Sequence, residues 1–163
     1  MSVLEQCDGE LTIDSVLMHT PAWNVLSVLP LWMPAEVRGE DRLLPLATGV
    51  IPYLRRRTVT RHSLPMVIQG EVDENDVPYP DVWAGLEANL AQLRSSVVDP
   101  TGVGDGTRPA SLVMPSGAVR TADVHVLGLL LGRTQAGTNT LTGNEGVGML
   151  ATLELSIPAG VFV

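Results

Sequence analysis

The stretch from Arg55 to Val97 constrains the fold of this chain most, because it joins a strand pattern to the clearest helix pattern in the sequence. Leu64, Met66 and Ile68 alternate with other residue types, which is the period of a half-buried strand. Asp81 can then accept hydrogen bonds from the first turn of a helix, and apolar residues follow at spacings of three and four. These spacings predict a helix over residues 82–97. Its apolar stripe would consist of Trp83, Leu86, Leu90, Leu93 and Val97, and its solvent-facing side of Glu87, Asn89, Gln92 and Arg94.

Most other segments have the two-residue period of β-strands. We expect strands over residues 10–18 and 23–32, and a hairpin that turns at Ser116-Gly117. Residues 127–131 are apolar on both faces, and residues 134–146 are predicted to form a polar, mobile loop. The last strand alternates most regularly, with Val147, Met149, Ala151, Leu153, Leu155 and Ile157 on one face and Thr152, Glu154 and Ser156 on the other. The chain is therefore predicted to be a single, mainly β domain with one helix (α+β) over residues 1–163.

Two segments depart from this regular pattern. Pro65 cannot donate a hydrogen bond, so one side of its strand is predicted to be an edge or a bulge. Residues 34–52 carry three prolines and two glycines without a sustained period, which predicts a long loop or extended arm. Two alternatives stay open for the apolar residues of this arm: they dock on another subunit, or they fold back on their own domain. The apolar residues considered for docking are Leu43, Leu44, Leu46, Val50 and Ile51, of which the first three are the predicted interface residues.

The charges of the chain favour contacts between subunits over nucleic-acid binding. The net charge is −8, and all ten basic residues are arginines. Proteins that bind nucleic acid tightly gain affinity by neutralising phosphates, so this balance argues against such a role, although DNA could slide past such a surface. We expect the arginine cluster to pair with acidic residues of a neighbouring subunit, such as those of the loop at 71–76. The cluster consists of Arg55, Arg56, Arg57 and Arg61.

No pattern in the sequence predicts a catalytic, cofactor or metal site. His19, His62 and His125 lie in different predicted elements, with no metal-ligand spacing around them. The acidic loop at 71–76 lacks the glycine and the glutamate that an EF-hand loop requires, and the glycines at 102–106 follow a helix instead of opening one. Cys7 is alone, so no intramolecular disulfide is possible. No apolar run approaches the roughly 20 residues of a membrane helix. We therefore expect neither an enzyme nor a membrane protein.

Several short motifs in order resemble the small minor tail proteins of long-tailed phages of actinobacteria, which are similar to the tube-like domain of distal tail proteins. The motifs cover nearly the whole chain and are turns and packing residues. They are Ala22-Trp23, Arg38-Gly39, Leu44-Pro45, the segment 64–70, Gly85-Leu86, Asn89-Leu90, the segment 111–117 and the segment 124–126.

The resemblance implies a tail-tube-like β-sandwich flanked by one helix, with copies assembled into a hexameric ring. Such a ring would belong to the virion, assembled in the host cytoplasm, and would join the tail tube to the tip or baseplate proteins. Its channel would pass DNA and the tape-measure protein without binding them specifically. Thr152, Glu154 and Ser156 are the candidates for residues that face this channel. A major tail tube subunit and a monomeric β-sandwich binding module are the alternatives.

Overall fold

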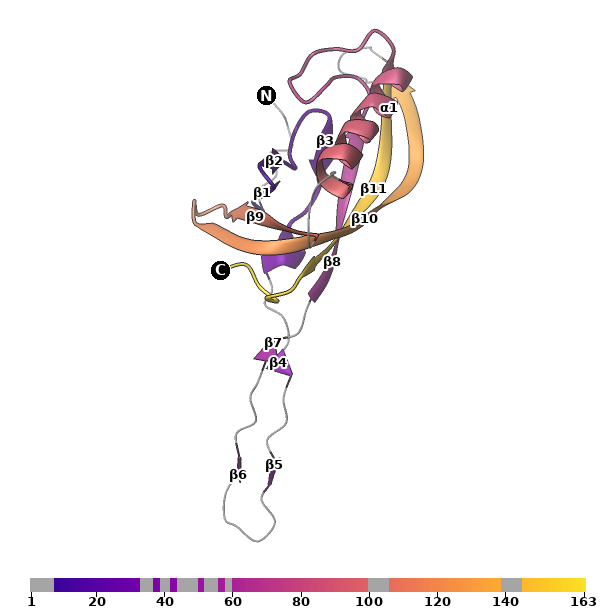
Figure 1. Ribbon diagram of the computed structural model, residues 1–163. Helices are drawn as coiled ribbons and strands as arrows, with labels where there is room; N and C mark the ends of the chain where they lie inside the picture. The colour runs from indigo at the N-terminus through magenta and orange to yellow at the C-terminus, as the bar shows by residue number, and fades with distance from the viewer. Residues whose placement is uncertain are drawn as a thin grey trace.

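The protein is described by a computed structural model for residues 8–32, 37–38, 42–43, 50–51, 56–57, 60–99, 106–138 and 145–163. These residues are mainly antiparallel β-structure with one α-helix, as predicted (Figure 1). The elements in chain order are β1 Glu10–Ile13, β2 Val16–Leu17, β3 Trp23–Val25, η1 Leu29–Trp32, β4 Val37–Arg38, β5 Arg42–Leu43, β6 Val50–Ile51, β7 Arg56–Arg57, β8 Thr60–Gln69, α1 Val82–Leu93, η2 Arg94–Val98, β9 Thr107–Val113, β10 Val119–Thr138 and β11 Glu145–Ile157. No helix among the described residues is long and apolar enough to cross a membrane.

The main sheet has seven strands in the order β2-β1-β9-β10-β11-β8-β3. The sheet is strongly bent, and the long strand β10 runs through both halves of the sheet (Figure 1). The chain after β2 also meets β3, because Val25 N–H donates to the Met18 carbonyl and His19 pairs with Asn24. The two outer strands of the sheet are thus joined, which satisfies backbone groups that an open sheet would expose. The two layers expected of a sandwich are therefore the two halves of one bent sheet.

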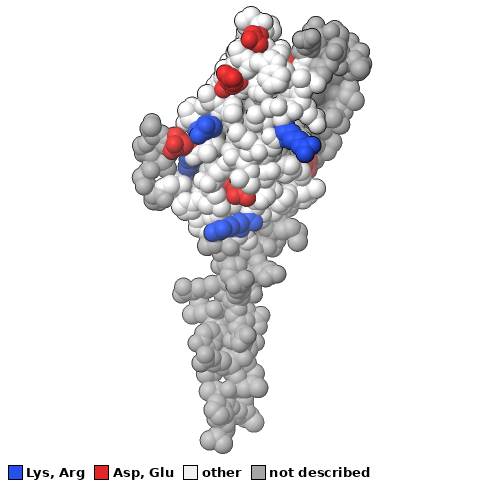
Figure 2. Space-filling model, turned by 90° about the vertical axis from the view of Figure 1, so that its right-hand side faces the viewer, with Lys and Arg blue, Asp and Glu red and all other residues white. Residues whose placement is uncertain are grey.

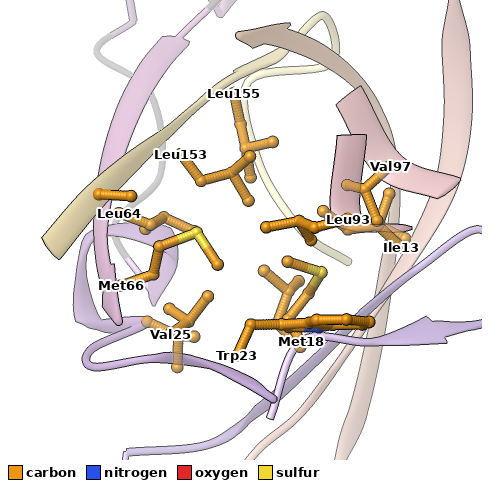
Figure 3. Packing of buried hydrophobic residues seen from close by; sticks show 14 of the residues in the cluster. Ile13, Met18, Trp23, Val25, Leu64, Met66, Leu93, Val97, Leu153 and Leu155 are labelled. Atoms are coloured by element: carbon orange, nitrogen blue, oxygen red, sulfur yellow. The ribbon is translucent and has the colours of Figure 1, made fainter. Parts of the chain in front are cut away.

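The core fills the space inside this bend. Leu64, Met66 and Ile68 of β8 are fully buried, as the alternation predicted. Figure 3 shows the side chains of Leu64 and Met66, and labelled side chains from β1, β3, β11 and α1, converging on one cluster, to which Ile68 also belongs. Leu153 and Leu155 come from the predicted buried face of β11. Aliphatic side chains and Trp23 thus supply the apolar burial that stabilises the domain.

The helix begins where the sequence predicts. Asp81 is its N-cap, and the Asp81 carboxylate accepts from Trp83 N–H at 2.9 Å. After Leu93 the backbone continues as a π-helical turn, η2, so the helical segment reaches Val98. Leu86, Leu93 and Val97 are buried on the core side, whereas Trp83 is 50% exposed. The prediction of Trp83 as a core residue is therefore wrong.

Asn89, predicted to face solvent, is instead completely buried. Its Nδ2 donates to the carbonyls of Gln69 and Val72, at 2.7 and 2.8 Å, and its Oδ1 accepts from the Tyr79 hydroxyl at 3.1 Å. The helix approaches this segment closely: a Cβ on Gly85 would lie 2.2 Å from the Gly70 carbonyl oxygen. The Asn89 side chain thus holds the segment between β8 and α1 against the helix, and its own buried polar atoms have hydrogen-bond partners.

The boundaries of three other segments differ from the prediction. Residues 10–18 form the hairpin β1–β2, because Asp14 and Ser15 adopt positive φ and turn the chain. The run at 23–32 is a strand only to Val25 and ends in the 3-10 helix η1. The loop predicted at 134–146 is shorter, since β10 continues to Thr138 and β11 starts at Glu145. In each case strand pairing or turn geometry overrides the polarity of the local sequence.

The described parts of the predicted arm are paired strands. β4 pairs with β7, and β5 pairs with β6, both antiparallel. The pairing brings Val37 opposite Arg57 and Leu43 opposite Val50. Both pairs lie beyond the end of the main sheet (Figure 1). The described strands of the arm thus form two small sheets separate from the main one.

Candidate assembly surfaces

Two strands of the main sheet have stretches that no described strand covers, on opposite sides of the β10-β11-β8 segment, although the 3-10 helix η1 contacts β8. β9 pairs with β10 only as far as His125, so no described strand covers residues 126–138 on that side. β3 pairs with β8 only over Met66–Ile68, so no described strand covers residues 60–64 on the other side. Unpaired edges carry backbone donors and acceptors that can accept a strand from another chain.

The pairing also indicates which backbone groups point outward at each edge. Backbone groups of successive residues in a strand point to alternate sides. Gln69 N–H donates to Ala22 and the Pro65 carbonyl accepts from Leu26, so the odd residues of β8 point away from β11. Ser63 belongs to this set. On β10, Leu131 lies opposite Ala151 of β11. The backbone N–H and C=O of Ala151 point to β8, so they do not bond to Leu131. The backbone groups of Leu131 therefore point away from β11, to the edge that no described strand covers.

The outer face of β10-β11-β8 is the face turned away from the core and from α1. Along β11, Leu150, Thr152 and Glu154 alternate with buried residues, and Ser156 follows on the same face but is itself buried. Two cross-strand rows on this face are polar: Gly128–Glu154–Ser63 and His125–Ser156–Arg61. The next two rows are largely apolar: Leu130–Thr152–Pro65 and Leu150–Val67–Asn24. The outer face is thus polar near the β8 start and apolar near the other end of these strands.

The candidate channel residues lie on the polar half or at its border. Thr152 and Glu154 are partly exposed, whereas Ser156 is only 7% exposed and presents little surface. Leu130 is 57% exposed and Leu150 is 47% exposed, and neither was among the predicted site residues. The stretch at 127–131 that is apolar on both faces was the sequence signal for this surface, because a strand apolar on both faces needs cover on both.

The predicted interface residues fall into three groups. Arg61 is exposed and lies on the outer face, opposite Ser156. Leu43 belongs to β5 in the arm, and Arg56 and Arg57 form β7, which pairs with β4 of the arm. Arg55, Leu44 and Leu46 lie outside the described residues. Leu43, Leu44, Leu46 and the three successive arginines therefore stay interface predictions.

The buried polar groups belong to packing, not to a shared site. The histidines lie apart: His19 Nδ1 contacts Asn24 Oδ1 at 3.0 Å, and burial lowers the pKa of His62. Arg108 is buried and donates to the Ser96 carbonyl near the end of the helix. Burial lowers the pKa of Arg108, although Asp14 and Asp99 oppose the shift. Among the described residues, no group of three or more histidine, cysteine or acidic side chains could hold a metal ion.

Charged side chains are sparse on the side of the molecule where β10 lies. Figure 2 shows this side as mostly uncharged, with isolated arginines and acidic residues around a white centre. The described surface here is therefore dominated by uncharged side chains. Such a surface suits contacts with protein more than contacts with phosphate groups.

Comparison with known proteins gives a structural likeness. No protein-family model matches the chain, and no curated protein matches it. Among solved structures the chain is similar to the Dit protein (gp 19.1) of SPP1, described as a paradigm of the hub adsorption apparatus in phages that infect Gram-positive bacteria. The match covers 93% of this chain and 50% of the Dit chain, at 12% identity and a TM-score of 0.41. The chain thus spans about half the length of that protein, and a TM-score of this size carries no argument about function.

Proposed function

We propose that this chain is a structural subunit of a phage tail, which joins side by side with other copies into a hexameric ring at the distal end of the tail. The ring would link the tail tube to tip proteins and surround the DNA channel. The tail and the ring size are what the family resemblance of the sequence motifs named above implies. The two free edges on opposite sides of the β10-β11-β8 segment are the observation that carries the proposal for side-by-side assembly.

The position of these edges favours a head-to-tail contact. The β10 edge of one copy can pair with the β8 edge of the next, which leaves the β10 edge of that copy free for a third. A contact between two different surfaces repeats until it closes into a ring or grows into a filament. The β8 edge is short, so each joint would add only a few backbone hydrogen bonds, and side-chain contacts beside the edges would supply the rest.

Proline substitutions at the two edges test this joint directly. Proline removes one backbone N–H, so Leu131→Pro disables the β10 edge and Ser63→Pro the β8 edge, while the bonds of both strands to β11 remain. We expect the wild-type protein to form rings in negative-stain images, with a matching mass in light scattering, and each variant alone to be monomeric. Leu131→Ala and Ser63→Ala keep their N–H groups and serve as matched controls that should still assemble.

Mixing the two proline variants gives the sharpest outcome. Each variant keeps the edge that the other lacks, so an equal mixture should form dimers that cannot extend. Rings from either proline variant would refute pairing through these edges, and so would a mixture that stays monomeric. A wild-type protein that is monomeric at micromolar concentration, with no rings in virions, would instead support the solitary binding module.

A major tail tube subunit would use the same edges, since rings of either kind need the same lateral contact. The two roles differ in copy number. A tube subunit is present in many stacked rings per virion, whereas a distal ring is present once. Quantitative mass spectrometry of purified virions would therefore distinguish them, and a copy number of many rings would overturn the distal position.

A further inference from the structure

The strand directions in the main sheet restrict how one copy can join the next. β10 and β8 are each antiparallel to β11, so they run in the same direction on the two sides of that strand. The inference rests on the proposed function, in which β10 of one copy pairs with β8 of the next copy. Such a pair is either parallel or antiparallel, and the two orientations place the sheet faces of the second copy differently.

The parallel orientation keeps the outer faces of all copies on one side of the assembly. A copy that is moved sideways along the sheet keeps its strand direction, so its β8 runs parallel to the β10 that it meets. Reversing the strands while β8 still meets β10 requires a half-turn about the line that joins the two strands. That half-turn exchanges the two faces of the sheet, so every second copy would carry α1 on the other side. The copies of a cyclic ring are equivalent, which excludes this alternation.

The backbone groups at the two edges lead to the same orientation. On β8 the outward groups belong to residues with side chains on the outer face, such as Ser63, which lies opposite Glu154. On β10 they belong to residues with side chains on the core-side face, such as Leu131, which lies opposite Ala151. In an antiparallel ladder, two residues that exchange backbone hydrogen bonds lie directly opposite each other and share a face. An antiparallel joint would therefore continue the outer face of one copy into the core-side face of the next.

We propose that neighbouring copies join through a parallel pairing of β10 with β8, whereas the pairs between described strands within one copy are antiparallel. In a parallel pair, a residue whose groups point across lies opposite one whose groups point away, and bonds to the residues on either side of it. Ser63 opposite Leu130, for example, would donate to the Leu129 carbonyl and accept from Leu131 N–H. Ser63 and Leu130 both lie on the outer face. The outer face thus continues from copy to copy, and the helices stay on the other side.

Disulfide trapping between two single-cysteine variants tests the orientation and requires no knowledge of the register. Cys7 is the only cysteine of the chain, so Cys7→Ser provides a cysteine-free background. Ser63→Cys in this background is mixed with a variant that carries its cysteine on β10, and disulfide-linked dimers are measured on a non-reducing gel after mild oxidation. The variants at outer-face positions of β10 are Gly128→Cys, Leu130→Cys and Gln135→Cys. The variants at core-side positions are Leu129→Cys, Leu131→Cys and Thr134→Cys.

A parallel joint brings Ser63 next to outer-face positions, because opposing residues of a sheet share a face and a disulfide needs Cβ atoms about 4 Å apart. We expect at least one outer-face variant to cross-link to Ser63→Cys about tenfold more than any core-side variant does. Val77→Cys, at a 56% exposed position in the loop before α1, is the control for random collision.

The possible results separate the orientation from the proposed function. Preferred cross-linking of the core-side set would show an antiparallel joint, and would overturn the inference while keeping the pairing of β10 with β8. Rings that cross-link with neither set would refute the β10-β8 joint itself. Disulfide dimers of one β10 variant alone would indicate a two-fold joint between β10 edges and overturn both proposals. Protein that neither assembles nor cross-links would refute the ring.

Discussion

Replacing Asn89 by leucine should destabilise the domain strongly, although leucine favours helices and is close to asparagine in size. The change removes both Nδ2 donations and leaves the buried carbonyls of Gln69 and Val72 without their donor. It also removes the acceptor of the Tyr79 hydroxyl. An unsatisfied buried polar group costs about 1–3 kcal/mol, and added apolar burial offsets part of this sum. We expect a net loss of about 3 kcal/mol.

A loss of about 3 kcal/mol lowers the melting temperature of a domain of this size by about 6–12 °C. Thermal and urea denaturation followed by circular dichroism would measure it. Tyr79→Phe removes only the 3.1 Å hydroxyl bond and should cost about 1 kcal/mol. Ala88→Leu places the same side chain at an exposed helix position and should be nearly neutral. If Asn89→Leu cost no more than Tyr79→Phe, the three-bond account of Asn89 would be refuted.

Two further predictions concern close packing and pH. Gly85→Ala should lower the melting temperature by several degrees, because its Cβ would lie 2.2 Å from the Gly70 carbonyl oxygen, whereas Gly128→Ala, with no atom within 4 Å of the added Cβ, should be nearly neutral. Burial lowers the pKa of His62, so protonation of this ring is less favourable in the folded state than in the unfolded state. The stability that this provides is present above the unfolded pKa of about 6.5 and is lost as the pH falls below it. Urea titrations at pH 7.5 and 5.5 should therefore differ less for His62→Phe than for the wild type, and an unchanged difference would contradict the assignment.

Local patterns predicted the elements whose burial follows a simple period. Leu64, Met66 and Ile68 share one face of β8 because side chains alternate along a strand. Asp81 caps the helix because a carboxylate there accepts from a free N–H of the first turn. In both cases the physical cause lies within a few residues of the chain. Packing against the rest of the domain leaves both elements as the local sequence predicts them.

The errors occur where a distant partner decides the outcome. Hydropathy assigned Trp83 to the core and Asn89 to solvent, and the structure places them the other way round. Asn89 is buried because carbonyls of the preceding segment require donors, a need that no helical period can indicate. Polar residues up to Thr138 join β10 because they pair with the start of β11. For the same reason the sequence could not locate the candidate assembly surfaces, since an uncovered strand edge depends on where the neighbouring strands end.

Pro65 links the local sequence to the proposed joint between copies. Its carbonyl accepts from Leu26 N–H, but its nitrogen has no hydrogen to donate in return. The Leu26–Pro65 pair therefore has one backbone hydrogen bond instead of two, β3 ends at Val25, and the chain continues into the 3-10 helix η1, which contacts β8. Residues 60–64 of β8 keep their outer backbone groups unpaired by any described strand as a result. A single proline that reads as a defect in a strand thus creates the edge on which the next copy would pair.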